Sequence, residues 1–139
     1  MIYAVDVEIT APVKQTEVTD RVADAITKLF PEAEVTTHPG ELVAEAHSMD
    51  HFSECLHKQQ ILDTARGEFF ATLEGDKFSF DLKKQAAFKG IVNFSVGKPG
   101  ELGDLSVRVR VREPDAETFI DHIAPPTEDG KPVTPEERR

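Results

Sequence analysis

One segment, residues 105–112, constrains the fold more than any other part of this sequence. Its apolar and polar residues alternate strictly: Leu105, Val107, Val109 and Val111 are separated by Ser106, Arg108, Arg110 and Arg112. Side chains of a β-strand point alternately to the two faces of a sheet, so the segment predicts a strand with one apolar and one basic face. Such a strand needs a sheet that is covered on one side and open to solvent on the other.

The rest of the chain predicts further strands and several helices. Residues 3–9 alternate in the same way. We expect shorter strands at 33–37, 41–46, 78–82 and 91–96, and helices at 16–30, 48–56, 61–73, 83–89 and 115–123. The helical segments on either side of Lys58 could form one bent helix or two. Some strands follow one another directly, which favours an α+β fold with a single, largely antiparallel sheet and helices packed on one face.

Length and composition indicate one domain. The chain has 139 residues, 39% of them hydrophobic, which suits one core. Residues 124–139 are rich in Pro, Glu, Thr and Arg, so we expect a domain over residues 1–123 and a disordered, acidic tail after it. We also expect a cytoplasmic protein, because the sequence shows no basic leader and no run near the roughly 18 apolar residues of a membrane span. The single cysteine, Cys55, permits no internal disulfide.

Charge is distributed unevenly along the chain. Sixteen basic residues face 26 acidic ones, and the formal net charge of -10 opposes binding to a polyanion at long range. Residues 82–112 nevertheless carry seven basic and two acidic residues, a net of +5, so the remainder is -15. An acidic coat with one basic region fits a protein in a salt-rich cytoplasm, where distant repulsion is screened. Ordinary acidity with chance clustering is equally open.

The arginines at 108, 110 and 112 are the first candidates for a binding site. On a strand they share one face at intervals of about 7 Å, close to the phosphate repeat of an extended nucleic-acid strand. Arginine can also donate two parallel hydrogen bonds to one phosphate. The alternative is that these side chains pair across the sheet with carboxylates such as Asp6 and Glu8.

A second basic group follows the strand expected at 78–82. Lys83, Lys84 and Lys89 surround a short helical turn that ends at Gly90, and they could contact phosphates. The alternative is a connecting segment whose Ala86, Ala87 and Phe88 fill the core while the lysines remain in water.

Metal and catalytic sites find little support in the sequence. His47, His51 and Cys55 recur every four residues, as zinc ligands on one helix could. Ser48, however, is a plausible helix N-cap, which would leave His47 outside the helix and favours an ordinary polar helix surface. No phosphate-binding glycine loop or nucleophile elbow is present. We therefore expect no metal, no cofactor and no enzyme activity.

Two runs carry a resemblance to a known family. Residues 58–66 read Lys-Gln-Gln-Ile-Leu-Asp-Thr-Ala-Arg, and residues 84–94 read Lys-Gln-Ala-Ala-Phe-Lys-Gly-Ile-Val-Asn-Phe. With the opening strand and the Phe30-Pro31 helix end, they resemble a small archaeal family of uncharacterised proteins described as predicted exosome-associated or RNA-binding proteins. The resemblance spans most of residues 1–123. It implies an α+β fold similar to that of the ribosomal protein that binds 5S rRNA, and RNA as a partner. It implies no catalytic residues, and it adds Gln59 and Arg66 as weaker candidates.

Our first hypothesis is a non-enzymatic RNA-associated protein that contacts phosphates through a basic sheet face. Its candidate residues are Arg108, Arg110, Arg112, Lys83, Lys84, Lys89, Gln59 and Arg66. The second hypothesis is a protein-interaction module or homodimer, in which the same arginines pair with carboxylates of a partner. The third is a small hydrolase that uses acidic residues and histidines brought together by the fold.

Overall fold

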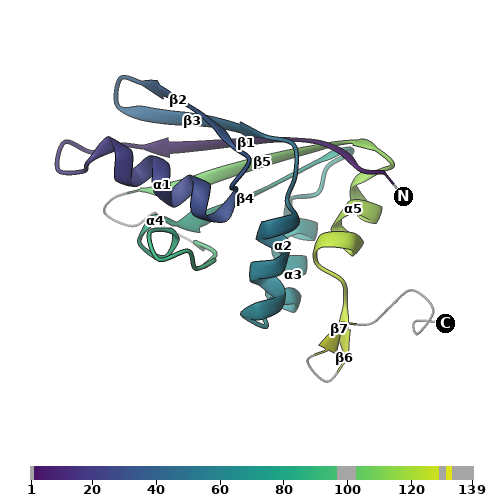
Figure 1. The fold of residues 1–139 in the computed structure, drawn as a ribbon. Coiled ribbons are helices and arrows are strands. Elements are labelled where there is room, and N and C mark those ends of the chain that lie inside the picture. The colour runs from purple at the N-terminus through teal and green to yellow at the C-terminus, as the bar shows by residue number, and fades with distance from the viewer. Residues whose placement is uncertain (1, 97–102, 129–130, 133–139) are drawn as a thin grey trace.

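The computed structural model describes residues 2–96, 103–128 and 131–132. Five strands form an antiparallel sheet in the order β2-β3-β1-β5-β4 (Figure 1). They are β1 (Ala4–Pro12), β2 (Glu34–His38), β3 (Glu41–Ala46), β4 (Lys77–Lys83) and β5 (Asp104–Glu113). The helices are α1 (Thr19–Leu29), α2 (Asp50–Lys58), α3 (Leu62–Thr72), α4 (Lys84–Ala87) and α5 (Ala116–Ile123).

The helices lie on one face of the sheet, and the described residues place no helix on the other (Figure 1). This confirms the predicted α+β class with a single antiparallel sheet. The alternating patterns explain why one face of the sheet is apolar and the other polar, because every second side chain of β1 and β5 points toward the helices. That set is fully buried or nearly so: Val5, Val7, Ile9, Ala11, Leu105, Val107, Val109 and Val111.

Phenylalanines fill the space between the sheet and the helices. Phe69 of α3 packs against Phe78 and Phe80 of β4, with ring centroids 5.0 and 4.9 Å apart. Phe52 of α2 stacks on Phe30 at 5.2 Å and on Phe80 at 5.4 Å. Each buried phenylalanine contributes about 1.5–3 kcal/mol through removal of apolar surface from water. This packing leaves only the opposite, polar face of the sheet open for contacts.

The segment around Lys58 forms two helices. The turn between α2 and α3 contains Gln60, whose φ of 57° places it in the left-handed region. Such a residue interrupts the helical hydrogen bonds, so the chain changes direction there. The N-cap of α2 is Met49 and not Ser48, so the predicted N-cap is wrong by one residue, although the Ser48 hydroxyl accepts a hydrogen bond from the backbone N–H of Asp50 at 3.2 Å.

The prediction of a strand at residues 91–96 is wrong. That segment makes one isolated bridge, between Phe94 and Leu82 of β4. Val92 and Phe94 are buried, but Ile91 is 44% and Val96 75% exposed. The segment therefore anchors two side chains in the core without continuing along the edge of the sheet.

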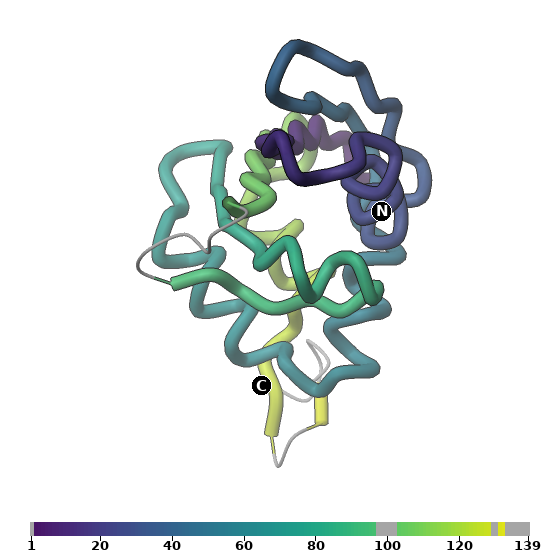
Figure 2. The backbone as a smooth tube through the Cα atoms, turned by 90° about the vertical axis from the view of Figure 1, so that its left-hand side faces the viewer, coloured from purple at the N-terminus to yellow at the C-terminus, as the bar shows by residue number. Residues whose placement is uncertain are grey.

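The chain remains structured beyond the expected domain boundary at residue 123. Ala124 is fully buried, and the hydroxyl of Thr127 donates to Asp63 Oδ1 at 2.6 Å. Two short strands follow, β6 (Thr127–Glu128) and β7 (Lys131–Pro132), and pair as a hairpin. In the perpendicular view of Figure 2 this hairpin lies far from β2 and β3. The rest of the predicted disordered tail, residues 129–130 and 133–139, lies outside the described residues.

Candidate nucleic-acid interface

The predicted arginine strand is β5, and its basic side faces solvent. The side chains of Arg108, Arg110 and Arg112 are 75%, 58% and 53% exposed on the open face of the sheet. Strand geometry produces this placement, because the residues between them point into the core. These arginines therefore share one accessible surface, as the alternation predicted.

Each arginine lies beside a carboxylate. Arg108 Nη1 is 3.9 Å from Glu8 Oε1, and Arg112 Nε is 3.0 Å from Asp6 Oδ2, both on the neighbouring strand β1. Arg110 Nε donates to Asp76 Oδ2 at 3.1 Å. Pairing with Asp6 and Glu8 was the alternative left open by the sequence. All these side chains are substantially exposed, and exposed ion pairs contribute only about 0–1 kcal/mol, so a phosphate can compete for the arginines.

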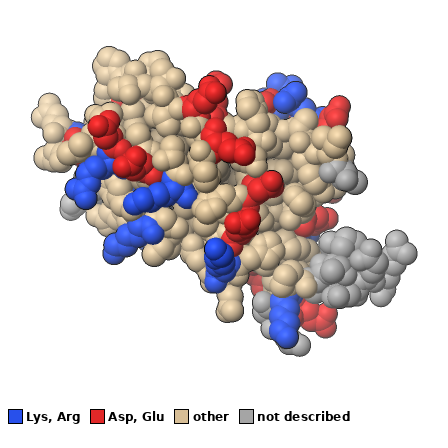
Figure 3. All heavy atoms as spheres, viewed as in Figure 1, with Lys and Arg blue, Asp and Glu red and all other residues tan. Residues whose placement is uncertain are grey.

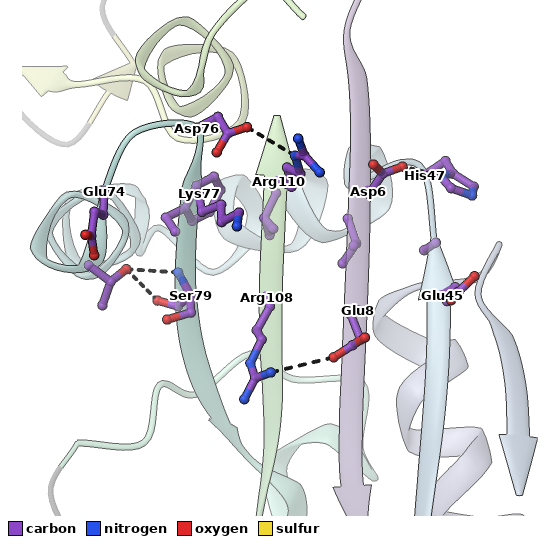
Figure 4. Close-up of a pocket in the computed structure, with 15 residues that line it drawn as sticks. Asp6, Glu8, Glu45, His47, Glu74, Asp76, Lys77, Ser79, Arg108 and Arg110 are labelled. Carbon is purple, nitrogen blue, oxygen red and sulfur yellow. Dashed lines mark hydrogen bonds and ion pairs between the residues drawn. The ribbon is translucent and has the colours of Figure 1, made fainter. Parts of the chain in front are cut away.

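A hollow of about 790 Å³ opens on this face, across strands β4, β5, β1 and β3. The wall at β4 and β5 carries the cations Lys77, Arg108 and Arg110, with the carboxylates of Glu74 and Asp76 beside them (Figure 4). The other wall is acidic and is formed by Asp6, Glu8 and Glu45, with His47 at its edge. The strand order places all the described lysine and arginine residues of the hollow on β4 and β5, whereas β1, β3 and the residue after β3 supply only carboxylates and His47 as its charged or titratable side chains.

Hydrogen bonds support both ends of the hollow. The hydroxyl of Thr72 donates to the carbonyl of Ser79 at 2.7 Å and accepts from its N–H at 2.9 Å, which fixes the end of α3 against β4 (Figure 4). At the opposite side, His47 Nδ1 lies 3.2 Å from Asp6 Oδ1 and 3.1 Å from the carbonyl of Val5. These hydrogen bonds fix the position of Ser79 on one side of the hollow and of His47 on the other.

Lys77 and Asp76 belong to this surface, although sequence analysis did not single them out. Lys77 occupies the same face as Ser79, and its strand register places it opposite Arg110. The alternation of Phe78, Phe80 and Leu82 could have identified Lys77, since it puts Lys77 on the polar face. Asp76 precedes the strand, where no periodic signal exists.

Lys83, Lys84 and Lys89, which were predicted to flank the arginines, lie in three different environments. Lys83 ends β4 on the open face and is exposed. Lys89 is also exposed, but it follows α4, which lies on the helical side of the sheet (Figure 1). Figure 3 shows several basic side chains gathered over the region of α1 and α4, a second basic area apart from the arginine strand.

Lys84 is buried and is not available to bind RNA. Its side chain is 0% exposed, and its Nζ lies 3.0 Å from Glu17 Oε1 and 2.5 Å from the carbonyl oxygen of Pro12. A buried ammonium requires such partners to offset its lost hydration. Lys84 therefore fastens the start of α4 to the end of β1 and the segment before α1.

Gln59 also has a structural role. Its amide donates to the carbonyl of Val92 at 2.8 Å and accepts from the N–H of Val92 at 2.8 Å. This two-point contact holds the segment after α4 against the end of α2. Both polar ends of the side chain are used, which explains why Gln59 is not presented to solvent as a binding residue.

Arg66 binds the C-terminal part of the domain. Its Nη1 donates to Asp121 Oδ1 at 2.6 Å and to the carbonyl of Ala124 at 3.2 Å. The guanidinium also lies over the ring of Phe70, 4.8 Å from its centroid. Arg66 therefore joins α3 to α5 on the helical side, away from the arginines of β5.

The histidines and the cysteine are not assembled into a metal centre. Cys55 Sγ lies 3.7 Å from His51 Nε2, whereas His47 follows β3 and contacts β1 instead. No group of three potential ligands occurs among the described residues. Burial raises the pKa of the Cys55 thiol above 9.0; Lys58 opposes that rise and Glu54 adds to it. Within the described chain, none of the helices has the length and apolarity needed to cross a membrane.

Comparison with known proteins identifies the family. A family model described as RNA binding matches residues 6–113. A UPF0201 protein of Thermococcus kodakarensis is 33% identical over 135 residues, which cover 92% of this chain and 95% of that protein. The chain belongs to the UPF0201 family. A UPF0200/UPF0201 protein of Archaeoglobus fulgidus is 38% identical over 130 residues, but the chain spans 40% of that protein, and 55% of a UPF0201 protein of Methanopyrus kandleri.

Solved UPF0201 structures share the fold. A Methanococcus jannaschii UPF0201 protein, 33% identical, aligns with a TM-score of 0.86 over 93% of this chain and 99% of that one. A second UPF0201 structure, 37% identical, aligns with a TM-score of 0.82 over 92% and 99%. These comparisons confirm the resemblance to an archaeal family seen in the sequence. The expected similarity to the ribosomal protein that binds 5S rRNA stays a prediction.

Proposed function

We propose that this UPF0201 protein is a non-enzymatic RNA-associated protein whose open sheet face contacts phosphates through β5 and β4. The observation that carries the proposal is the exposed row Arg108, Arg110 and Arg112 on the uncovered face of the sheet. The description of the matching family model as RNA binding supports it, since that match includes most of β1 and all of β4 and β5.

The geometry suits phosphates in three respects. The three guanidinium groups repeat along one strand at about 7 Å, so successive phosphates of one backbone can meet successive arginines. Lys77 and Lys83 extend the positive charge onto β4, beside Arg110 and at the end of the strand. The carboxylates that now pair with the arginines form weak surface contacts, which a doubly hydrogen-bonded phosphate can replace.

The acidic remainder of the protein restricts where RNA can lie. The net charge is -10; Asp6, Glu8 and Glu45 line the hollow opposite its cations, and Glu74 and Asp76 lie beside Lys77 and Arg110. A polyanion is therefore attracted to the arginines of β5 and to Lys77, and repelled by the carboxylates of β1 and β3 and by Glu74 and Asp76. This arrangement favours a single backbone track along β5 and makes binding strongly salt-dependent.

The test is a salt series of binding to a hairpin RNA with a single-stranded loop, measured by fluorescence anisotropy. Arg108→Ala/Arg110→Ala should weaken binding at least tenfold at low salt, because each arginine–phosphate hydrogen bond is worth about 1 kcal/mol or more. The slope of log affinity against log salt should become shallower by about 1.4, because two arginines no longer neutralise phosphates.

The matched control is Arg21→Ala/Lys89→Ala, which removes the same charge from exposed positions near α1 and α4. Its affinity should fall by less than about threefold, through the change in net charge alone. A larger loss in this control than in the β5 variant would move the RNA site to the α1–α4 region. Absence of RNA binding by the wild type, with a mass that rises with concentration in light scattering, would instead favour the protein-interaction module or homodimer.

A further inference from the structure

The hollow on the open face has a second wall that phosphate contacts leave unused. The register places Glu45 of β3 directly opposite Glu8 of β1 on one side and Glu34 of β2 on the other. Carboxylates directly opposite each other in a sheet repel. Glu8 is partly compensated by Arg108 at 3.9 Å, whereas no lysine, arginine or histidine of the described chain lies within ion-pair distance of Glu45.

Glu45 and Arg108 lie on opposite walls of this one cavity. They occupy the same row across the sheet, in the order Ser79, Arg108, Glu8 and Glu45. Neighbouring strands are about 4.8 Å apart, so β5 and β3 are separated by about 10 Å. A ligand that spans the row must therefore carry an anion at one end and hydrogen-bond donors at the other. The distance between these two ends is about the length of one nucleotide.

We propose that the hollow binds an unpaired guanine nucleotide of RNA, with its phosphate on Arg108 and Lys77 and its base edge on Glu45. This inference rests on the proposed function and names the part of RNA that the site selects. Guanine presents two adjacent N–H donors, N1–H and the N2 amino group, which match the two oxygens of one carboxylate. Cytosine and adenine place a ring-nitrogen acceptor beside their amino group, and uracil places carbonyl oxygens on both sides of its N–H, so each repels a carboxylate.

The same chemistry excludes a base-paired guanine. In a duplex, N1–H and the N2 amino group are already donated to cytosine, so the edge that Glu45 contacts is occupied. Sequence-specific RNA recognition generally uses such exposed edges in loops and single strands. The acidic wall then has a selective role: it repels a second phosphate backbone and accepts only a base that can donate to it.

The experiment uses labelled single-stranded RNAs of about eight nucleotides, a length within the range of single-strand binding sites. Each is uridine throughout except for one central G, A, C or U. The guanine RNA should bind about fivefold to tenfold more tightly than the other three, as a bidentate base contact provides. Annealing it to its complement should remove the preference. Guanosine monophosphate alone should compete only at much higher concentration, since it offers one phosphate; equal affinity would assign the site to free nucleotides and overturn an RNA site.

Glu45→Gln is the decisive variant, because its amide offers one donor and one acceptor in place of two acceptors. The preference for guanine should fall below about twofold, while overall affinity rises slightly as a negative charge is removed. Glu41→Gln is the matched control: Glu41 is exposed on the same strand and face, outside the hollow, so the preference should be retained. RNA binding without a guanine preference, or a preference that survives Glu45→Gln, overturns this inference alone. Failure of every RNA to bind overturns the proposed function instead.

Discussion

Replacement of Lys84 by methionine should destabilise the domain strongly. Methionine keeps the apolar stem of the side chain but removes the ammonium, which contacts Glu17 Oε1 at 3.0 Å and the carbonyl of Pro12. Glu17 is only 5% exposed, so its carboxylate would remain buried with the backbone N–H of Lys14 as its remaining donor at 2.9 Å. The variant therefore leaves an uncompensated charge inside the protein.

The magnitude follows from the burial of both partners. Removal of one member of a buried ion pair costs about 3–5 kcal/mol, mostly because the other charge stays unpaired. For a domain of this size, each kcal/mol shifts Tm by about 3 °C, so Lys84→Met should melt about 10–15 °C lower than the wild type. Urea unfolding followed by circular dichroism gives the free energy of unfolding directly.

Two comparisons make this prediction specific. Lys83→Met changes the neighbouring lysine, which is exposed on the open face, and should alter stability by less than about 0.5 kcal/mol. Lys84→Met/Glu17→Gln removes both charges and should recover about half of the missing stability, because the Glu17 carboxylate no longer stays buried without its cation. Equal effects of Lys83→Met and Lys84→Met, or a double variant as unstable as the single one, would refute the role assigned to this ion pair.

Three further outcomes are expected. Gln59→Ala should lower the free energy of unfolding by about 1–3 kcal/mol and accelerate hydrogen exchange of the Val92 amide; unchanged exchange would contradict the two-point contact. Arg66→Ala should cost about 1 kcal/mol in urea unfolding, since Arg66 and Asp121 are 25% and 36% exposed, and should leave RNA affinity unchanged. Burial raises the pKa of Cys55, so the neutral thiol contributes stability below about pH 9 that is lost as pH rises through the higher folded pKa. The rate of Cys55 labelling by iodoacetamide should accordingly rise at a higher pH in the folded chain than in the urea-unfolded chain. Labelling rates with the same pH dependence in both states would contradict the raised pKa.

The sheet was predictable because its signal is local and periodic. Alternation in β1 and β5 follows directly from the pleat of a strand, and it correctly placed Arg108, Arg110 and Arg112 together on one exposed face. The same reasoning failed at residues 91–96. Alternation there reflects two anchored side chains, Val92 and Phe94, and pairing with a neighbour cannot be deduced from such a short pattern.

The candidate site was less predictable because its contacts join distant parts of the chain. Lys84 looked like an exposed cation, but its partner Glu17 is 67 positions away and becomes visible only in the folded protein. Gln59 and Arg66 were singled out by family resemblance, and their contacts are internal. The hollow itself depends on the strand order, which places β1 between β5 and β3 and so sets the arginines of β5 opposite the carboxylates of β1 and β3.

The most direct test of the central claim is to locate RNA on the protein surface by NMR. Side-chain Nε–Hε signals of the arginines report each guanidinium separately during titration with the hairpin RNA. We expect large shifts for Arg108 and Arg110, and little change for Arg21 on α1 and Arg66 on α3. Shifts confined to Arg21, with Arg108 and Arg110 unperturbed at saturation, would contradict an RNA interface on the open face of the sheet.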